Sequence, residues 1–352
     1  MKTRSILVGA LLAAFTTAAA QAAAFTAGNL VVSRVGDGSV LVNTGGAISL
    51  LEFTTAGSAV QTINVATSTL QWSGTASSEG LITLSKDRTS LTVVGYAPPF
   101  TGTGSLGNRT DAQAPRNVLT IGTDGSIGTP VAVGAFSGNN IRSGVSDGTG
   151  FWLAGGTTGT VYNNGSNTTI QSTVTNTRVV NIFNNNLYFS TGSGANRGIY
   201  GFTGTPSAAA TATLLISTGA TSSPFDFAIN DSGTVAYVAD TASVFRYTFD
   251  GLVWSSTGSV AGLTGVTGLA VDFGLTSDSI FAVTPTTLFG VSYSIGSTTF
   301  GTPNTLASAG VNFAFRGLEF SPTVIPEPSA FAAIAGGLAL AGVIVGRRRR
   351  TA

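Results

Sequence analysis

Five charged residues recur at one position of a repeated pattern, at the start of an apolar segment. They are Glu79, Arg142, Arg178, Asp226 and Arg316. Carboxylates such as Glu79 and Asp226 can act as a general acid and a general base on a sugar bond, because paired carboxylates do this without histidine. Arginine side chains can instead bind anionic or hydroxyl-rich ligands through their planar set of N–H donors. Both kinds of chemistry require these residues to meet in space.

Other familiar kinds of site are disfavoured by composition. The chain has no histidine and no cysteine, which excludes a Ser-His-Asp triad and argues against zinc or copper. Asp37, Asp124, Asp147 and Asp231 precede glycine or serine-glycine, but none belongs to the dense acidic series of a calcium loop, so we predict that they form turns. We expect no metal ion and no cofactor, and calcium between repeats is the alternative left open.

The elements that position the charged residues are repeated hairpins. Each repeat has an apolar strand, a turn with aspartate or asparagine, and a second apolar strand. The first strands of five repeats begin near Leu81, Val145, Val180, Phe227 and Leu269, at spacings of 64, 35, 47 and 42 residues. The later spacings are typical of four-stranded propeller blades, which are about 40–50 residues long. The longest interval contains a glycine- and threonine-rich insertion, residues 98–115, which we predict to be a surface loop.

The two ends of this region complement each other. A further first strand, Phe315–Phe320, has no partners after it, whereas strands over Leu30–Val35, Ile48–Phe53 and Gln61–Val65 lack a leading strand. Pairing of the N- and C-terminal strands would complete a last blade and close the ring, which removes exposed sheet edges. We predict an all-β fold, a β-propeller of six four-stranded blades. Seven blades, or a β-sandwich or β-solenoid, are the alternatives.

In such a propeller the innermost strands line a central channel and run in one direction. The five charged residues would therefore converge on one mouth of the channel. Ligand binding at this mouth is one interpretation, since convergent polar groups orient ligands. The other interpretation is a ring of mutually paired arginines and carboxylates that locks neighbouring blades. We expect Trp72, Trp152 and Trp254 to pack within blades, and the alternative is that they stack on sugars.

The N-terminus has the pattern of a secretory signal peptide over residues 1–24. Lys2 and Arg4 precede a short apolar region, Ile6–Phe15, and a tract of small residues, Ala18–Ala24, follows it. We therefore predict export of the chain.

The C-terminus, residues 325–352, contains three features in order. Pro326, Glu327 and Pro328 precede an apolar run over residues 330–346, and Arg347, Arg348, Arg349 and Arg350 follow. The combination resembles the PEP-CTERM sorting signal of Gram-negative bacteria. The resemblance implies an exosortase as processing partner and delivery to the cell surface or the extracellular matrix. We predict a transmembrane helix over residues 330–346 that anchors the chain in the inner membrane before processing, with the arginines in the cytoplasm. An ordinary single-pass anchor is the alternative.

The region between the two ends, residues 25–324, is acidic. Six of the 16 basic residues and one of the 15 acidic residues lie in the terminal segments, which leaves ten basic and 14 acidic residues and a net charge near −4. A nucleic-acid partner would need a clustered basic face, so we expect none.

This region resembles exported β-propellers of the YVTN and quinoprotein-like group. The segments that carry the resemblance are Leu30–Gly38, Ser78–Gly80, Asn139–Ser143 and Phe315–Gly317. The resemblance implies a fold and a surface location but no reaction. We expect a non-catalytic binding or structural protein of an exopolysaccharide or biofilm layer. The alternative is a carbohydrate-active hydrolase or lyase that uses Glu79 and Asp226 at the channel mouth.

Overall fold

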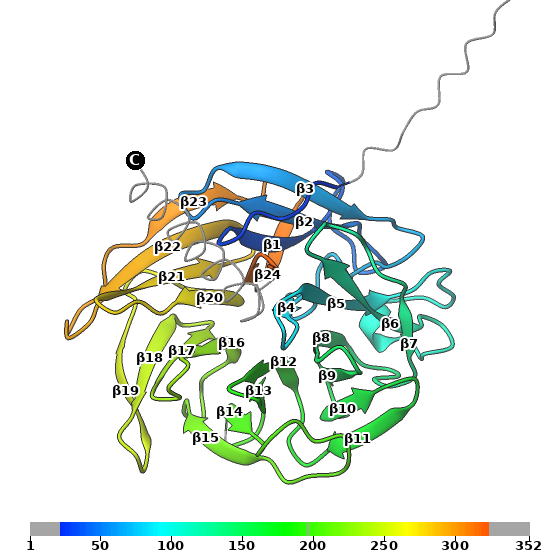
Figure 1. Cartoon of the computed structure of the whole chain (residues 1–352). Coiled ribbons are helices and arrows are strands. Elements are labelled where there is room, and N and C mark those ends of the chain that lie inside the picture. The colour runs from blue at the N-terminus through cyan, green and yellow to red at the C-terminus, as the bar shows by residue number, and fades with distance from the viewer. Residues whose placement is uncertain (1–21, 196, 324–352) are drawn as a thin grey trace, which may run out of the picture.

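The computed structural model describes residues 22–195 and 197–323, and their strands form a β-propeller (Figure 1). Six four-stranded antiparallel sheets surround a common axis. The fold class predicted from the repeats, an all-β propeller with six blades, is thus confirmed.

Each sheet begins with an innermost strand near the axis and ends with an outermost strand at the periphery (Figure 1). In that order, three sheets contain β4 (Thr83–Leu84), β5 (Ser90–Tyr96), β6 (Arg116–Gly122) and β7 (Val131–Val133); β8 (Ile141–Ser146), β9 (Phe151–Gly155), β10 (Thr160–Asn163) and β11 (Asn167–Gln171); and β12 (Thr177–Phe183), β13 (Asn186–Thr191), β14 (Gly198–Gly201) and β15 (Thr213–Ser217). The other three contain β16 (Pro224–Ile229), β17 (Val235–Asp240), β18 (Val244–Phe249) and β19 (Trp254–Ser259); β20 (Gly268–Asp272), β21 (Ser277–Val283), β22 (Thr287–Ser294) and β23 (Asn304–Ser308); and β24 (Ala314–Phe320), β1 (Leu30–Val35), β2 (Ile48–Phe53) and β3 (Ala59–Val65).

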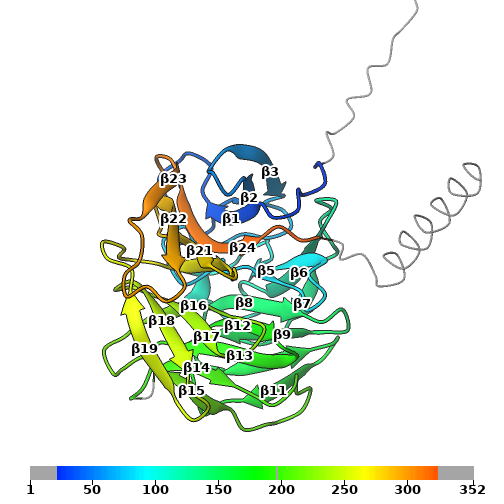
Figure 2. The same cartoon turned by 60° about the vertical axis from the view of Figure 1, so that its left-hand side comes forward.

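The last of these sheets combines strands from both ends of the described chain. β24 is its innermost strand and pairs antiparallel with β1, from Leu30 opposite Phe320 to Val35 opposite Ala314. A bulge between Val32 and Arg34 shifts the register. Figure 2 shows β24 beside β1, with β2 and β3 following in the same blade.

The hydrophobic core is divided among the junctions between blades. Each of six clusters of buried apolar side chains joins two neighbouring sheets. For example, one cluster joins Val31 of β1 to Leu91 of β5, and another joins Tyr237 of β17 to Ile280 of β21. Middle strands are buried on both faces, so they read as continuous apolar runs and do not alternate strictly.

The insertion over residues 98–115 differs from the predicted surface loop. It contains a short 3₁₀ helix, Leu106–Asn108, and Leu106 and Ala114 are fully buried between the β4–β7 and β8–β11 sheets. The guanidinium of Arg116 is also buried and donates to the carbonyls of Ala114 and Arg109, each at 2.8 Å. The segment has few apolar residues among its glycines and threonines, so its composition predicted an exposed loop. The structure shows instead that part of it packs around Arg116.

The terminal predictions fall mainly on residues that the structure does not describe. Residues 1–21 of the predicted signal peptide lie outside the described range, as do the Pro326–Pro328 motif, the predicted helix over residues 330–346 and the Arg347–Arg350 cluster. Within residues 22–195 and 197–323, no helix has the length and apolar character needed to cross a bilayer.

The packing of β24 predicts a large effect of one truncation. Leu318 is fully buried in the cluster between the β24 sheet and the β20–β23 sheet. We expect Leu318→Ala to lower the free energy of unfolding by about 2–5 kcal/mol, through lost burial and a residual cavity. Val311→Ala, at an 85% exposed position in the loop before β24, should change it by less than about 0.5 kcal/mol. Urea unfolding curves measure both, and equal midpoints would show that β24 does not pack in the core.

Candidate functional site: a cavity at one end of the propeller channel

The five charged residues singled out in the sequence lie in or just before the innermost strands, near the points where these strands begin. Glu79 lies just before β4, and its carboxylate accepts hydrogen bonds from the Ser73 amide at 2.9 Å, the Tyr96 hydroxyl at 2.7 Å and the Asn140 side chain. Asn140 precedes β8 of the next sheet. Glu79 therefore links its own blade to the neighbouring one.

Arg142 and Asp226 form the same kind of link. The Arg142 guanidinium donates to the carbonyl of Thr177, the first residue of the next innermost strand, at 3.1 Å. The Asp226 carboxylate accepts from the Leu269 amide of the next sheet at 2.9 Å and from the adjacent Phe227 amide at 2.8 Å.

Arg178 makes the most extensive link. Its guanidinium donates to the Ser223 carbonyl and hydroxyl at 3.0 and 2.9 Å and to the Pro224 carbonyl at 3.0 Å. It also lies over the Phe225 ring, with 3.8 Å between the guanidinium carbon and the ring centroid. Arg178 of the β12 sheet is thus fixed to the start of β16.

Arg316 and Thr267 complete the series. The Arg316 guanidinium donates to the Gly74 carbonyl at 2.7 Å, and the Thr267 hydroxyl donates to the Arg316 carbonyl at 2.8 Å. Every junction between neighbouring blades therefore has a polar link at this end. The partners are mainly backbone groups of the next blade, so the links differ from the arginine–carboxylate pairs considered from the sequence.

Burial explains the electrostatics of these groups. Burial lowers the pKa of Arg178 and of Arg316 to about 10 in each case. Burial also raises the pKa of Glu79, although its three hydrogen bonds and the charge of Arg316 act in the opposite direction. Glu79 and Asp226 are buried and do not line the cavity described below. The structure thus gives these two carboxylates no open cleft in which to act as acid and base.

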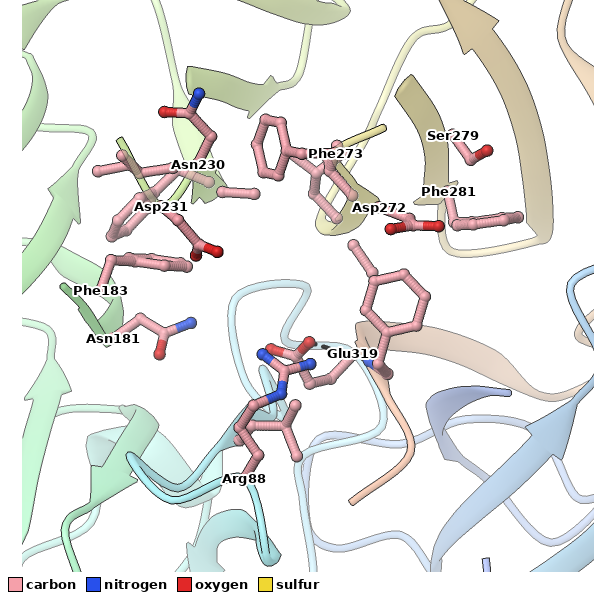
Figure 3. Close-up of a pocket in the computed structure, with 18 of the residues that line it drawn as sticks. Arg88, Asn181, Phe183, Asn230, Asp231, Asp272, Phe273, Ser279, Phe281 and Glu319 are labelled. Carbon is pink, nitrogen blue, oxygen red and sulfur yellow. Dashed lines mark hydrogen bonds between the residues drawn. The ribbon is translucent and has the colours of Figure 1, made fainter. Parts of the chain in front are cut away.

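A cavity of about 920 Å³ lies at the other end of the channel, where the innermost strands finish (Figure 3). Every sheet except the β8–β11 sheet contributes to its lining. Five phenyl rings take part: Phe183, Phe227, Phe273, Phe281 and Phe320. Five charged residues also take part: Lys86, Arg88, Asp231, Asp272 and Glu319. A large cavity with aromatic walls and a few polar groups is the usual form of a small-molecule site.

The turns that follow the innermost strands hold these side chains in place. Asn184 follows β12 in the left-handed conformation (φ 50°) and donates from its side chain to the Asn230 carbonyl at 3.1 Å. Asn230 follows β16, and its own side chain accepts from the amides of Thr234 and Val235. The asparagine and aspartate turns recognised in the sequence therefore build the cavity rim.

Asp231 and Asp272 differ from other turn aspartates. The carboxylates of Asp124, Asp147 and Asp250 accept hydrogen bonds from amides of their own turns. The carboxylates of Asp231 and Asp272 accept no hydrogen bond within the described chain. Their carboxylates face the cavity from opposite sides of its upper wall (Figure 3).

Arg88 and Glu319 form the opposite wall, where their charged groups point toward each other (Figure 3). Burial raises the pKa of Glu319 above its usual value, although the positive charge of Arg88 acts in the opposite direction. The Thr323 amide donates to the Arg88 carbonyl at 2.9 Å, and Thr323 itself lines the cavity. The described chain therefore ends at the rim of the cavity.

Asn181 places a hydrogen-bond donor in the cavity. This residue of β12 is only 7% exposed, and its Oδ1 accepts from the Ile182 amide at 2.8 Å. That bond identifies the other side-chain atom as the Nδ2 donor. Nδ2 points into the cavity (Figure 3) and has no hydrogen-bond partner within the described residues.

The three tryptophans lie away from this cavity. Trp72 and Trp152 are buried, and their indole N–H groups donate to the carbonyls of Val94 and Pro206 at 2.5 and 2.7 Å. Trp254 packs beside Phe249, with 5.4 Å between the ring centroids. The expectation of blade packing is confirmed for all three.

The acidic turns do not gather into a metal site within residues 22–195 and 197–323, where no group of three or more carboxylates is placed to hold an ion. The residues that line the cavity were missed as a group in the sequence. They could have been found by taking the ends of the repeated strands, a few residues beyond the charged starts.

The fold and cavity define the molecule as a six-bladed β-propeller with a ligand-sized site at one end of its channel. No protein-family model matches the sequence, and no curated protein matches it at a significant level.

Solved propellers resemble it at low identity. One, from Bacteroides uniformis and provisionally described as a 6-phosphogluconolactonase, is 12% identical with a TM-score of 0.46 over 84% of this chain and 83% of its own. A protein of unknown function from Desulfotomaculum acetoxidans is 13% identical with a TM-score of 0.46 over 82% of this chain and 98% of its own. An auxiliary nutrient-binding protein from Bacteroides thetaiotaomicron is 12% identical with a TM-score of 0.44 over 80% and 77%. Likeness at this level carries no argument about what this chain binds.

The buried carboxyl group of Asp226 predicts a pH dependence of stability. Burial raises the pKa of Asp226 well above that of an ordinary aspartic acid. The unfolded chain releases this proton at about pH 4, so above that pH the folded protein binds more protons and its free energy of unfolding falls as pH rises. We expect Asp226→Asn to lose less stability than the parent protein between about pH 4 and the raised pKa, as measured by urea midpoints.

Asp250 supplies the control with the opposite sign. The Val253 and Leu252 amides lower the pKa of this exposed aspartate, so its contribution is present above the unfolded pKa and disappears as pH falls. The free energy of unfolding of Asp250→Asn should therefore increase less with rising pH than that of the parent protein. Identical pH slopes for the parent protein and Asp226→Asn would refute the assignment of a raised pKa to Asp226.

Proposed function

We propose that this protein is exported to the cell surface or the extracellular matrix and binds polysaccharide there in the channel cavity, without catalysis. The cavity is the observation that carries the proposal. Its phenyl rings offer flat apolar faces for the C–H faces of sugars, and its amide and carboxylate groups suit hydroxyls. Its volume of about 920 Å³ is within the usual range for ligand sites, roughly 300–1,000 Å³.

Binding is favoured over the alternative, a carbohydrate-active hydrolase or lyase. That alternative depends on Glu79 and Asp226, and both are buried, accept hydrogen bonds from neighbouring groups and do not line the cavity. The carboxylates that do line the cavity, Asp231, Asp272 and Glu319, come from different blades. No hydrogen bond pairs any of them with a second acid or base.

The terminal sequences support the location. A signal peptide over residues 1–24 would export the chain, and the PEP-CTERM-like segment, residues 325–352, would direct it to an exosortase. A helix over residues 330–346 would hold the precursor in the inner membrane until processing. Since the last strand, β24, ends at Phe320, cleavage at Pro326–Pro328 would leave every blade strand in place.

The binding proposal is tested with the processed protein from the cells that make it and with their isolated exopolysaccharide. Asn181→Leu removes the unpartnered donor from the cavity, and we expect it to weaken binding about tenfold, the effect of one lost hydrogen bond. Arg178→Ala, at the other end of the channel, should lower the melting temperature but leave the affinity of the folded protein unchanged. Loss of binding in Arg178→Ala alone would place the ligand at the charged ring.

The sorting proposal is tested in the same cells. We expect Glu327→Ala to leave the protein in the inner-membrane fraction, because the altered triplet would no longer be recognised for processing. Ser329→Ala, two residues beyond, serves as the matched control and should be sorted as the parent protein is. Cell fractionation and the mass of the mature chain are the measurements. A Glu327→Ala protein with the parental mass and location would contradict the role of the triplet.

A further inference from the structure

The charged groups of the cavity are distributed unevenly between its walls. The β16 and β20 sheets present Asp231 and Asp272, and neither carboxylate has a hydrogen-bond partner within the described residues. The opposite wall presents Arg88 and Glu319, which face each other and offset each other's charge (Figure 3). Lys86, in the same turn as Arg88, also lines the cavity and adds a positive charge on that side. The uncompensated negative charge is therefore concentrated on the wall formed by Asp231 and Asp272.

Phenyl rings accompany the two carboxylates. Phe183 lies below Asp231, Phe273 lies between the two acidic residues, and Phe281 lies beside Asp272 (Figure 3). The face of an aromatic ring attracts a cation, and carboxylates are acceptors that require N–H or O–H donors. An ammonium group satisfies both, since it carries positive charge and three donors.

Asn181 adds a requirement of the opposite kind. Its Nδ2 group is a donor without a hydrogen-bond partner among the described residues, on a residue that is only 7% exposed. A donor in such a position is satisfied by an acceptor oxygen of the ligand. The ligand that meets both requirements carries an ammonium group together with hydroxyl or ring oxygens.

We propose that the cavity binds a saccharide with a free, protonated amine, with the ammonium at the wall that carries Asp231 and Asp272 and an oxygen accepting from Asn181. This inference rests on the proposed saccharide-binding function and names the class of sugar. Sugars whose amine is acetylated lack the positive charge, and acidic sugars would meet the two carboxylates with repulsion.

The test compares two soluble probes, a glucosamine oligosaccharide and its fully N-acetylated counterpart, by calorimetric titration of the processed full-length protein. We expect tighter binding of the free amine and a weaker affinity at high salt. Asp231→Asn and Asp272→Asn should each weaken binding of the amine about fivefold, the upper range for one exposed ion pair. Asp250→Asn, which removes the same charge from a turn outside the cavity, should leave the affinity unchanged.

The outcomes separate this inference from the function on which it rests. Amine binding weakened about fivefold in each cavity variant, with no change in Asp250→Asn, supports the inference. Equal binding of both probes, unaffected by Asp231→Asn and Asp272→Asn but weakened by Asn181→Leu, overturns the amine and retains saccharide binding in the cavity. Binding of neither probe nor the exopolysaccharide overturns both proposals.

Discussion

The structure depends on the burial of each sheet against its two neighbours. A single four-stranded sheet of this chain has no core of its own, because the apolar clusters lie at the junctions between sheets. Such a molecule is stable only when the series of sheets returns to its start, since an unpaired sheet would expose an apolar face and a free edge. The pairing of β24 with β1 places a strand from each end of the described chain in one sheet. The absence of cysteine is consistent with this, because the core alone must hold the fold.

The two ends of the channel differ in how neighbouring blades are linked. Charged side chains make most of the links at the strand starts, and they make none of the links described at the strand ends. At the strand starts, the half-buried Arg178 and the buried Asp226 are hydrogen-bonded to the next blade, so these groups serve the structure. At the strand ends, the links are made by turn asparagines and backbone groups, for example from Asn184 to Asn230. These small links leave space between the strand ends and leave Asp231, Asp272 and Asn181 with unused hydrogen-bonding capacity. The buried polar links and the cavity therefore lie at different positions along the channel.

Much of the fold, but only part of the site, could be predicted from the sequence. The spacing of apolar hairpins identified the blades, because each repeat must supply one whole sheet, and it placed the five charged residues near the starts of the innermost strands. The pattern could not show that Arg142 and Arg178 donate hydrogen bonds to backbone carbonyls. Charged side chains that bind a ligand and charged side chains that link neighbouring blades would recur at the same spacing in the sequence. Asp231 and Asp250 have similar turn contexts in the sequence, yet only Asp250 caps its turn. That difference arises from side-chain direction, which no local pattern records.

The antiparallel register of β1 and β24 has a mechanical consequence. The described chain enters β1 at Leu30 and leaves β24 at Phe320, directly opposite each other. Force applied between these two points would open the ladder one residue pair at a time from that end, so the fold resists such a pull weakly. A load that pulls β24 along its own axis acts differently. All its hydrogen bonds to β1 then share the load at once, as in a lap joint under shear.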